Sequence, residues 1–229
     1  IWYTPQSGIW QTVWLEAVPE SYVRSLRITP DFDGAAVEIS ADIVGEEDAY
    51  AHFGGADYLL PASIPVPDFE AWSPEHPRLY GFSVSCGEDE VKSYFAMRKF
   101  SVEEDENGVP RLFLNNSPYF HNGLLDQGYW PDGLYTAPTD EAMIYDITTA
   151  KAMGFNMLRK HIKVEPLRWY YHCDRIGMLV WQDMVNGGRD YKSWYVTYMA
   201  TAMEGMHIRA KDTRIHLMGR QDPAGQRQL

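Results

Sequence analysis

The sequence predicts two folding units, a β-sandwich of immunoglobulin type followed by parallel α/β units. The first 103 residues show mainly the two-residue apolar alternation of β-strands. After residue 110 the apolar period becomes helical, and strands and helices alternate. Charge divides at the same place, because residues 31–110 carry 18 acidic and 4 basic side chains while residues 111–229 carry 12 and 14. This asymmetry favours a boundary near residues 103–110.

The first unit is predicted to consist of short strands joined by turns. Five segments are rich in aromatic and β-branched residues or alternate in polarity: residues 9–15, 23–28, 35–43, 80–85 and 93–100. The proline-rich stretch 61–77 lies between the third and fourth segments and is unsuited to a helix interior. Several short strands at this spacing are typical of an immunoglobulin-like sandwich. Residues 1–18 are expected to belong to a different β unit.

The second unit is predicted to alternate strands with helices. Short strands are expected at residues 112–114, 119–125, 155–158 and 178–181. Thr139 is a suitable N-cap for a helix that Gly154 would end. A second helix is expected to begin at Pro166 and end at Gly177. Short connections in this order imply parallel strands, and the absence of a G-x-G-x-x-G motif favours the opening of a (β/α) barrel over a nucleotide-binding sheet.

Composition excludes several functional classes. The chain has 229 residues, a formal net charge of −12 and a sequence pI near 4.9. This acidity argues against a nucleic-acid partner and against a polybasic membrane-binding segment. No apolar run approaches the roughly 20 residues that a spanning helix needs. The chain starts at Ile1 without a methionine, and we expect it to be a piece of a longer polypeptide.

Metal and nucleophile motifs are weak. His207 and His216 are nine positions apart, which fits no compact metal site. Cys86 and Cys173 are expected to be buried thiols, and His172 is expected to be structural. The sequence contains no G-x-S-x-G, H-E-x-x-H or P-loop motif. We therefore predict no metal site.

Polar and aromatic side chains follow each predicted strand of the second unit. In a (β/α) barrel the active site lies at these carboxyl ends of the strands. The candidate substrate-binding residues are Asp126, Gln127, Trp130, Arg159, Lys160, His161, Trp181 and Asp183. Carboxylates, amides, cations and indoles together favour a carbohydrate site, because polar groups bond hydroxyls and aromatic faces stack on a pyranose ring.

Several of these candidates also have a structural alternative. Asp126 could bond the backbone of its own loop, and the run Arg159–His161 could be solvated charge. Trp181 could be a core residue, and Asp183 could pair with a cation of that run. Whether Asp126 and Asp183 form a catalytic pair depends on a separation that is about 5–5.5 Å in retaining glycosidases.

At these residues the chain resembles glycoside hydrolase family 2, the family of bacterial β-galactosidases, β-glucuronidases and β-mannosidases. The likeness is carried in family order by YTPQSGIWQTVWL (3–15), WSPEHPRLY (72–80), FHNG (120–123), MGFNMLR (153–159) and CDRIGMLV (173–180). It spans nearly the whole chain and is specific for the family rather than for a substrate.

The resemblance implies three domain parts. Residues 1–20 would end an N-terminal jelly-roll sugar-binding domain, and residues 21–103 would form the immunoglobulin-like sandwich. Residues 104–229 would be the first part of a TIM-barrel catalytic domain. The implied activity is that of a retaining exo-β-glycosidase, β-galactosidase-like, that hydrolyses terminal β-linked sugars.

The implied mechanism is a double displacement with two glutamates, which we expect beyond Leu229. The sequence contains no Asn-Glu pair, the setting of the family's acid/base, so no catalytic residue is assigned. Arg159 matches the family arginine at the end of the second barrel strand. His161 falls one position from the usual histidine, and Asp183 matches an acid after the third strand. Leu125 replaces a polar residue frequent in β-galactosidases, which weakens the case for galactose.

The resemblance implies no cofactor and a carbohydrate substrate as partner. It is compatible with a homo-oligomer of the full-length protein, in the bacterial cytoplasm or periplasm. The alternative is a non-catalytic carbohydrate-binding or scaffolding relative that kept the fold and lost the acids.

Overall fold

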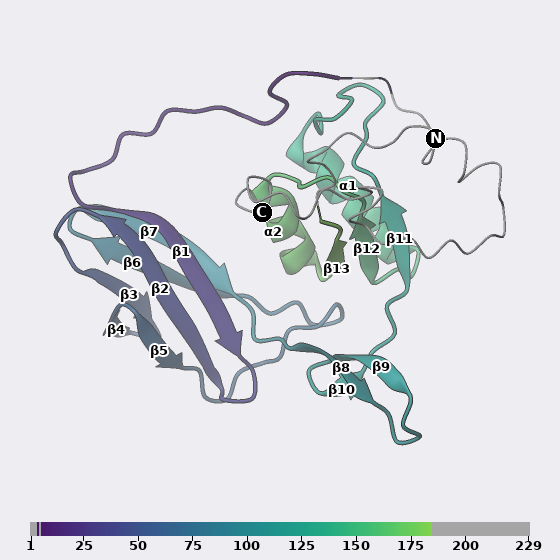
Figure 1. The fold of residues 1–229 in the computed structure, drawn as a ribbon, viewed down its shortest axis with the longest axis horizontal. Helices are drawn as coiled ribbons and strands as arrows, with labels where there is room; N and C mark the ends of the chain where they lie inside the picture. Colours follow the sequence, from purple (N-terminus) through teal and green to yellow (C-terminus); the bar gives the residue numbers. More distant parts are fainter. Residues whose placement is uncertain (1–3, 5, 185–229) are drawn as a thin grey trace, which may run out of the picture.

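A computed structural model describes residue 4 and residues 6–184 (Figure 1). The predicted features at His207 and His216 lie outside the described residues. Within the described part, a β-sandwich, a small antiparallel sheet and a parallel α/β layer follow one another along the chain (Figure 1). No helix among the described residues is long and apolar enough to cross a membrane.

The sandwich consists of two antiparallel sheets. One sheet has the order β1 (Tyr22–Asp31), β2 (Ala36–Val44), β5 (Ala62–Pro65). The other has the order β4 (Ala56–Leu59), β3 (Ala49–Phe53), β6 (Tyr80–Cys86), β7 (Asp89–Phe95). Alternate side chains of both sheets, such as Ile39, Ile64 and Val84, form one buried core. The apolar alternation seen in the sequence therefore marks the inner faces.

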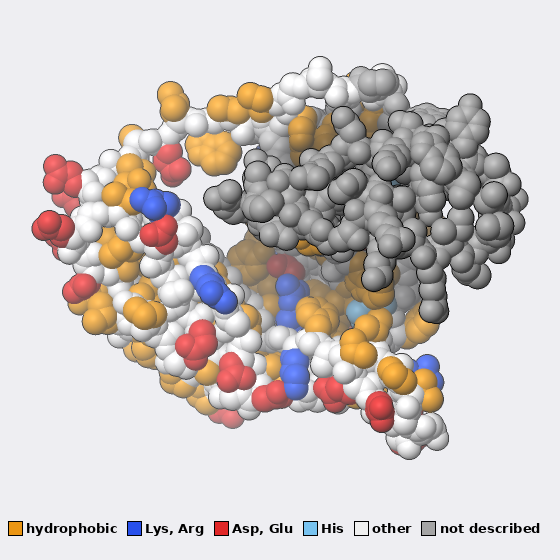
Figure 2. All heavy atoms as spheres, viewed as in Figure 1, with side chains coloured by type: hydrophobic (Ala, Val, Ile, Leu, Met, Phe, Trp, Pro, Cys, Tyr) orange, Lys and Arg blue, Asp and Glu red, His pale blue; other side chains and the backbone are white. Residues whose placement is uncertain are grey.

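Two predictions for this region were wrong or incomplete. The predicted strand at residues 9–15 forms no strand, and Ile9, Val13 and Leu15 are exposed along an extended segment (Figures 1 and 2). Strand-like composition is insufficient there because no described strand lies beside it to pair with. Strands β3, β4 and β5 were missed. The prolines around β5 stand at its borders, where they do not break its ladder.

A small antiparallel sheet connects the sandwich to the α/β layer. It has the order β10 (Ser117–Pro118), β9 (Pro110–Leu114), β8 (Phe100–Glu104). The predicted strand at 93–100 is thus divided between β7 and β8. The predicted strand at 119–125 begins later, at β11.

The α/β layer has three parallel strands with both helices against one face. Strand β12 (Met157–Lys160) lies between β11 (Gly123–Asp126) and β13 (Leu179–Gln182). The helices are α1 (Asp140–Ala152) and α2 (Leu167–Ile176). The predicted caps are confirmed, since Thr139 accepts a hydrogen bond from the Ala142 amide at 3.1 Å and Gly177 ends α2 in the left-handed conformation. The predicted parallel pairing is confirmed as well.

Asp174 of α2 joins the sandwich to the α/β layer. Its carboxylate accepts hydrogen bonds from Arg98 at 2.7 Å and from the Tyr94 hydroxyl at 2.9 Å. Its carbonyl accepts one from the indole of Trp72 at 2.8 Å, and Trp72 is fully buried beneath the Arg98 guanidinium. These contacts fix the sandwich against α2.

Candidate functional site

The strand register divides the predicted site residues into two rows. Leu125, Arg159 and Trp181 lie side by side across β11, β12 and β13. The next residues along the strands, Asp126, Lys160 and Gln182, form the neighbouring row. Because successive side chains of a strand point to opposite faces, the two rows face opposite sides of the sheet. The amino group of Lys160 lies 4.2 Å from the ring centroid of Trp169 in α2, so its row faces the helices.

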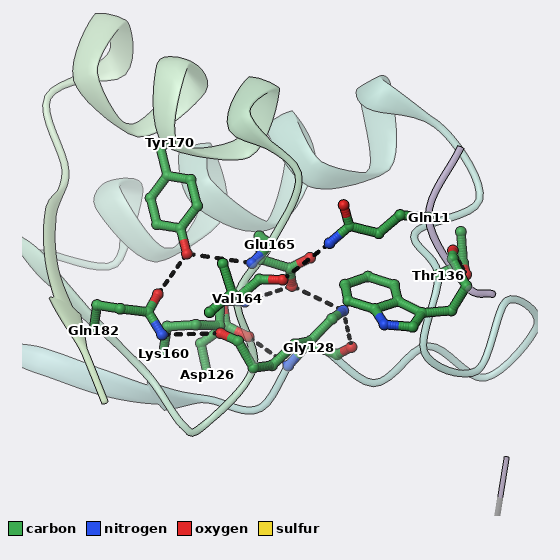
Figure 3. A network of polar contacts seen from close by, with 11 residues as sticks. Gln11, Asp126, Gly128, Thr136, Lys160, Val164, Glu165, Tyr170 and Gln182 are labelled. Carbon is green, nitrogen blue, oxygen red and sulfur yellow. Dashed lines mark hydrogen bonds and ion pairs between the residues drawn. The ribbon is translucent and has the colours of Figure 1, made fainter. Parts of the chain in front are cut away.

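The helix-side row is the base of a buried ionic network (Figure 3). Lys160 is 1% exposed, and its amino group lies 2.8 Å from Asp126 Oδ2 and 2.9 Å from Glu165 Oε1. Lys163 contacts the same Glu165 oxygen at 2.9 Å and donates to the Gly128 carbonyl at 2.6 Å. Two cations are therefore balanced by two carboxylates. Such pairing offsets the cost of removing these charges from water. Burial lowers the pKa of Lys163, against the opposing effect of Glu165.

Gln182 extends this network to β13 (Figure 3). Its side-chain oxygen accepts a hydrogen bond from the Tyr170 hydroxyl, and its amide nitrogen donates to the Lys163 carbonyl at 3.0 Å. The Tyr170 hydroxyl also accepts from the Glu165 backbone amide at 3.2 Å. The ends of all three strands are thus tied to the loop that precedes α2.

On the opposite, helix-free face, Arg159 and Asp183 form a bidentate pair. Arg159 Nε donates to Asp183 Oδ1 at 3.1 Å, and Nη2 donates to Oδ2 at 3.0 Å. The guanidinium holds the pKa of the Asp183 carboxyl below its usual range, and His161 adds an effect of the same sign. The Arg159 side chain is half exposed, so the pair lies where a ligand can reach it.

Trp181 stands on the same face beside this pair. The residue is 44% exposed, and its indole N–H donates to His121 Nδ1 at 2.8 Å. Burial lowers the pKa of His121, which keeps the imidazole neutral and able to accept that bond. The helix-free face therefore presents an oriented indole next to a guanidinium and a carboxylate.

A cavity of about 500 Å³ lies at the carboxyl ends of β11 and β12. Gln127 and His161, which follow these strands, form part of its wall, and their side-chain nitrogens are 3.3 Å apart. The N-terminal segment forms another part of the wall through Thr4, Gln6, Ser7, Gly8 and Trp10. A second cavity of about 440 Å³ lies on the helix side, against Asp126 and Lys160.

The structure places the eight predicted residues in different surroundings. Asp126 and Lys160 belong to the buried network. Arg159, Trp181 and Asp183 share the helix-free face. Gln127 and His161 border the 500 Å³ cavity. Trp130 is partly buried against the helix-side core and borders the 440 Å³ cavity. Whether any of them binds sugar stays a prediction.

Two structural alternatives weighed from the sequence are realised. Asp126 accepts a hydrogen bond from the Gly128 backbone amide at 2.8 Å, and Asp183 pairs with Arg159. The two carboxylates are held by different cations, Lys160 and Arg159, whose side chains point to opposite faces of β12. This arrangement argues against Asp126 and Asp183 as a catalytic pair.

Several residues of the site were not found from the sequence. Glu165 and Lys163 lie in the loop before α2, and His121 precedes β11. Tyr170 lies in the second predicted helix, for which the sequence suggested no site residue. Their roles depend on contacts across the sheet, and a single sequence carries no signal for those.

A scan against models of known protein families finds no match. Relatives are found among curated proteins named β-galactosidase. The chain is 26% identical to that of Leuconostoc mesenteroides subsp. mesenteroides, over 75% of this chain and 19% of the relative. It is 27% identical to that of Lactococcus lactis subsp. lactis, over 76% of this chain and 19% of the relative. It is 33% identical to that of Psychromonas ingrahamii, over 56% of this chain and 12% of the relative.

Solved structures share the fold. A β-glucuronidase of Faecalibacterium prausnitzii superposes with a TM-score of 0.64 at 21% identity, over 73% of this chain and 28% of that chain. A GH2 β-galacturonidase of Eisenbergiella tayi gives a TM-score of 0.64 at 20% identity, over 75% of this chain and 34% of that chain. The chain is therefore similar in sequence to β-galactosidases and in fold to GH2 enzymes, and it spans about one fifth of the length of the first β-galactosidases it matches.

Proposed function

We propose that this chain is part of a retaining exo-β-glycosidase that removes terminal β-linked sugars. The observation that carries the proposal is the helix-free face, where Trp181 stands beside the exposed Arg159–Asp183 pair at the carboxyl end of a parallel sheet. An indole supplies a stacking surface for a sugar ring, and the charged pair supplies donors and acceptors for its hydroxyls. The β-galactosidase names of the relatives support the same chemistry.

The domain arrangement belongs to this proposal. Residues 1–20 would end a jelly-roll domain, residues 21–103 would be the immunoglobulin-like sandwich, and residues 104–229 would begin a (β/α)₈ barrel. The parallel order of β11, β12 and β13 with both helices on one face supports the barrel, because the helix-free face is then its interior. The side chains of Arg159 and Trp181 would point into that interior.

The proposed mechanism is a double displacement by two glutamates that lie beyond Leu229. One carboxylic acid protonates the leaving oxygen while the other carboxylate attacks the anomeric carbon, and water then releases the sugar with retention. Residues of this chain bind and orient the sugar ring. Arg159, held by Asp183, is placed to donate hydrogen bonds to ring hydroxyls.

The test uses the full-length polypeptide that contains this chain. It is assayed against aryl β-galactosides and β-glucuronides, because the relatives and the solved structures carry both names. We expect turnover of at least one, with the β-anomer of the free sugar appearing first by NMR. The 229-residue chain alone serves as control and should show none.

Two outcomes would contradict the proposal. Release of the α-anomer first would exclude retention. Sugar binding without any turnover by the full-length polypeptide would support the non-catalytic carbohydrate-binding relative instead.

A further inference from the structure

We propose that Ser85, His52 and Asp57, on the outer face of the sandwich, form a second reactive site. In this site Ser85 takes an acyl group from an activated ester and passes it to water. The three residues lie on β6, β3 and β4, which are neighbours in one sheet (Figure 1). The site is separate from the helix-free face of the α/β layer, and the inference does not rest on the proposed glycosidase function.

Strand alternation places all three side chains outside the sandwich. Their neighbours in sequence, Ala51, Tyr58 and Val84, pack in the core between the two sheets. Because successive side chains of a strand point to opposite faces, the side chains of residues 52, 57 and 85 point outward. Three strands of one sheet therefore present these groups on a single surface.

The strand register brings the three groups together. Asp57 lies directly opposite His52 across β4 and β3. Ser83 lies opposite His52 on β6, and Ser85 is the next residue of β6 on the same face, so it is diagonal to His52. An aromatic side chain can reach a diagonal neighbour. The contact therefore follows from the pairing of regular strands, and rigid strands hold such groups more precisely than loops do.

The imidazole of His52 connects the carboxylate with the hydroxyl. Its Nδ1 lies 2.7 Å from Asp57 Oδ1, and its Nε2 lies 2.7 Å from Ser85 Oγ. With the proton on Nδ1, the ring donates a hydrogen bond to Asp57 and Nε2 accepts the one from the Ser85 hydroxyl. These are the contacts of a Ser-His-Asp triad, in which the carboxylate orients the base and the base activates the hydroxyl. The His52 side chain is 36% exposed, so a small ester can reach it.

The reaction is acyl transfer in two steps. Ser85 Oγ attacks the carbonyl carbon of the ester while its proton passes to His52 Nε2. The bond to the leaving oxygen then breaks, that oxygen takes the proton, and the acyl group stays on Ser85. Water next attacks the acyl-serine, gives one proton to His52, and the acid leaves as Ser85 Oγ takes that proton back. The sum is hydrolysis of an ester, with no oxidant and no cofactor.

The surroundings of Ser85 select the ester. Strand β6 lies between β3 and β7, so its backbone amides are bonded within the sheet instead of forming an oxyanion hole. Lys92 of β7 is exposed, lies opposite Ser83 and is diagonal to Ser85, so it is the cation on this face that can approach a developing oxyanion. Glu90, directly opposite Ser85, repels an anionic acyl group. Small neutral acyl groups on good leaving groups, such as phenyl acetates, are therefore the substrate class.

The experiment uses the full-length polypeptide and p-nitrophenyl acetate. We expect release of p-nitrophenolate above the rate in buffer, and acetyl-Ser85 in the acid-quenched protein by mass spectrometry. Ser85→Ala and His52→Gln should lower the catalysed rate about tenfold or more, because general-base activation of the hydroxyl is lost. Asp57→Asn should lower it as well, and Asp57→Glu, which keeps a carboxylate, should restore part of it. The Asp57 side chain is 71% exposed, so both of its variants leave folding intact.

Ser83→Ala is the matched control, because Ser83 lies opposite His52 on the same face but is not the serine bonded to it. It should keep the full esterase rate, and every variant should keep its melting temperature and its activity on glycosides. Ser85→Ala that hydrolyses the ester as fast as the unmodified protein would assign the reaction to another group and overturn the inference. Acetyl found only on residues other than Ser85 would overturn it too. Neither result bears on the proposed function, which is tested with glycosides alone.

Discussion

Arg159 at the exposed face of β12 and Asp183 just after β13 bind one another through two hydrogen bonds of 3.1 and 3.0 Å. Such a bidentate pair fixes the plane of the guanidinium as well as its position. Exposed ion pairs contribute little to folding, and the Arg159 side chain is half exposed. The consequence of the pair is therefore orientation of Arg159 rather than stability.

Asp183→Asn should impair the proposed activity without unfolding the protein. The amide cannot accept both guanidinium hydrogen bonds, so Arg159 loses its fixed orientation. We expect kcat/KM of the full-length polypeptide to fall about tenfold or more, with an unchanged melting temperature. Asp42→Asn is the matched control, because it breaks an exposed pair with Arg24 on the sandwich. An equal loss of activity in both variants would contradict the prediction.

Lys160 is expected to matter for folding. It is 1% exposed and is the cation between Asp126 and Glu165. Lys160→Met would leave Asp126 without its cation and Glu165 with Lys163 alone, at a cost of about 3–5 kcal/mol in the free energy of unfolding. Urea unfolding measures this cost.

The control for Lys160 is Lys99→Met, which removes the cation of an exposed pair with Asp33. It should change the urea midpoint little. A Lys160→Met protein as stable as the unmodified one would show that the network does not depend on this cation. If Lys160→Met lost sugar binding at full stability, the result would support the role of Lys160 as a direct sugar ligand instead.

The sequence predicted the parallel sheet but not how it divides the site. Thr139, Gly154 and Gly177 mark helix ends through local chemistry, so the alternation of strands and helices could be derived from the pattern. The two faces depend instead on the register between strands, which is set by pairing across tens of residues. Arg159 and Lys160 are neighbours in sequence, yet Arg159 is half exposed on the helix-free face and Lys160 is buried on the helix side.

The other errors have similar physical causes. The segment 9–15 has strand composition but no described partner strand. It is held by two side-chain hydrogen bonds, from Thr136 to the Trp10 carbonyl and from Gln11 to the Val164 carbonyl. Those contacts join residues more than 120 positions apart along the chain, so local propensity could not reveal them. The 500 Å³ cavity was unforeseen for the same reason.

His121 is expected to make stability depend on pH. Burial lowers its pKa below the ordinary 6.5, so between these two values the unfolded chain binds more protons than the folded one. The contribution of neutral His121 to the free energy of unfolding is complete above pH 6.5 and is lost as pH falls through the folded-state pKa of His121. Urea midpoints should therefore fall more between pH 7 and pH 5 in the unmodified protein than in His121→Gln.

His76→Gln is the control for this titration, because His76 is exposed on a loop of the first unit. Its pH dependence should match that of the unmodified protein. Trp181 fluorescence reports the same event, since protonation of His121 removes the acceptor of the indole N–H. Equal pH dependence in His121→Gln and the unmodified protein would refute the prediction.

Asp174 should control the coupling between the sandwich and the α/β layer. Its carboxylate is the shared partner of Arg98 and Tyr94, and burial together with Asp174 raises the pKa of Tyr94, which keeps that hydroxyl protonated as a donor. Asp174→Ala leaves both donors without their acceptor in a partly buried joint. We expect a loss of about 1–3 kcal/mol in the free energy of unfolding and faster proteolysis between residues 96 and 110.

The control is Asp57→Ala, which removes an exposed partner of His52 and should change neither the free energy of unfolding nor the rate of proteolysis. Unchanged proteolysis in Asp174→Ala would mean that Trp72, bonded to the Asp174 backbone carbonyl, holds the joint by itself.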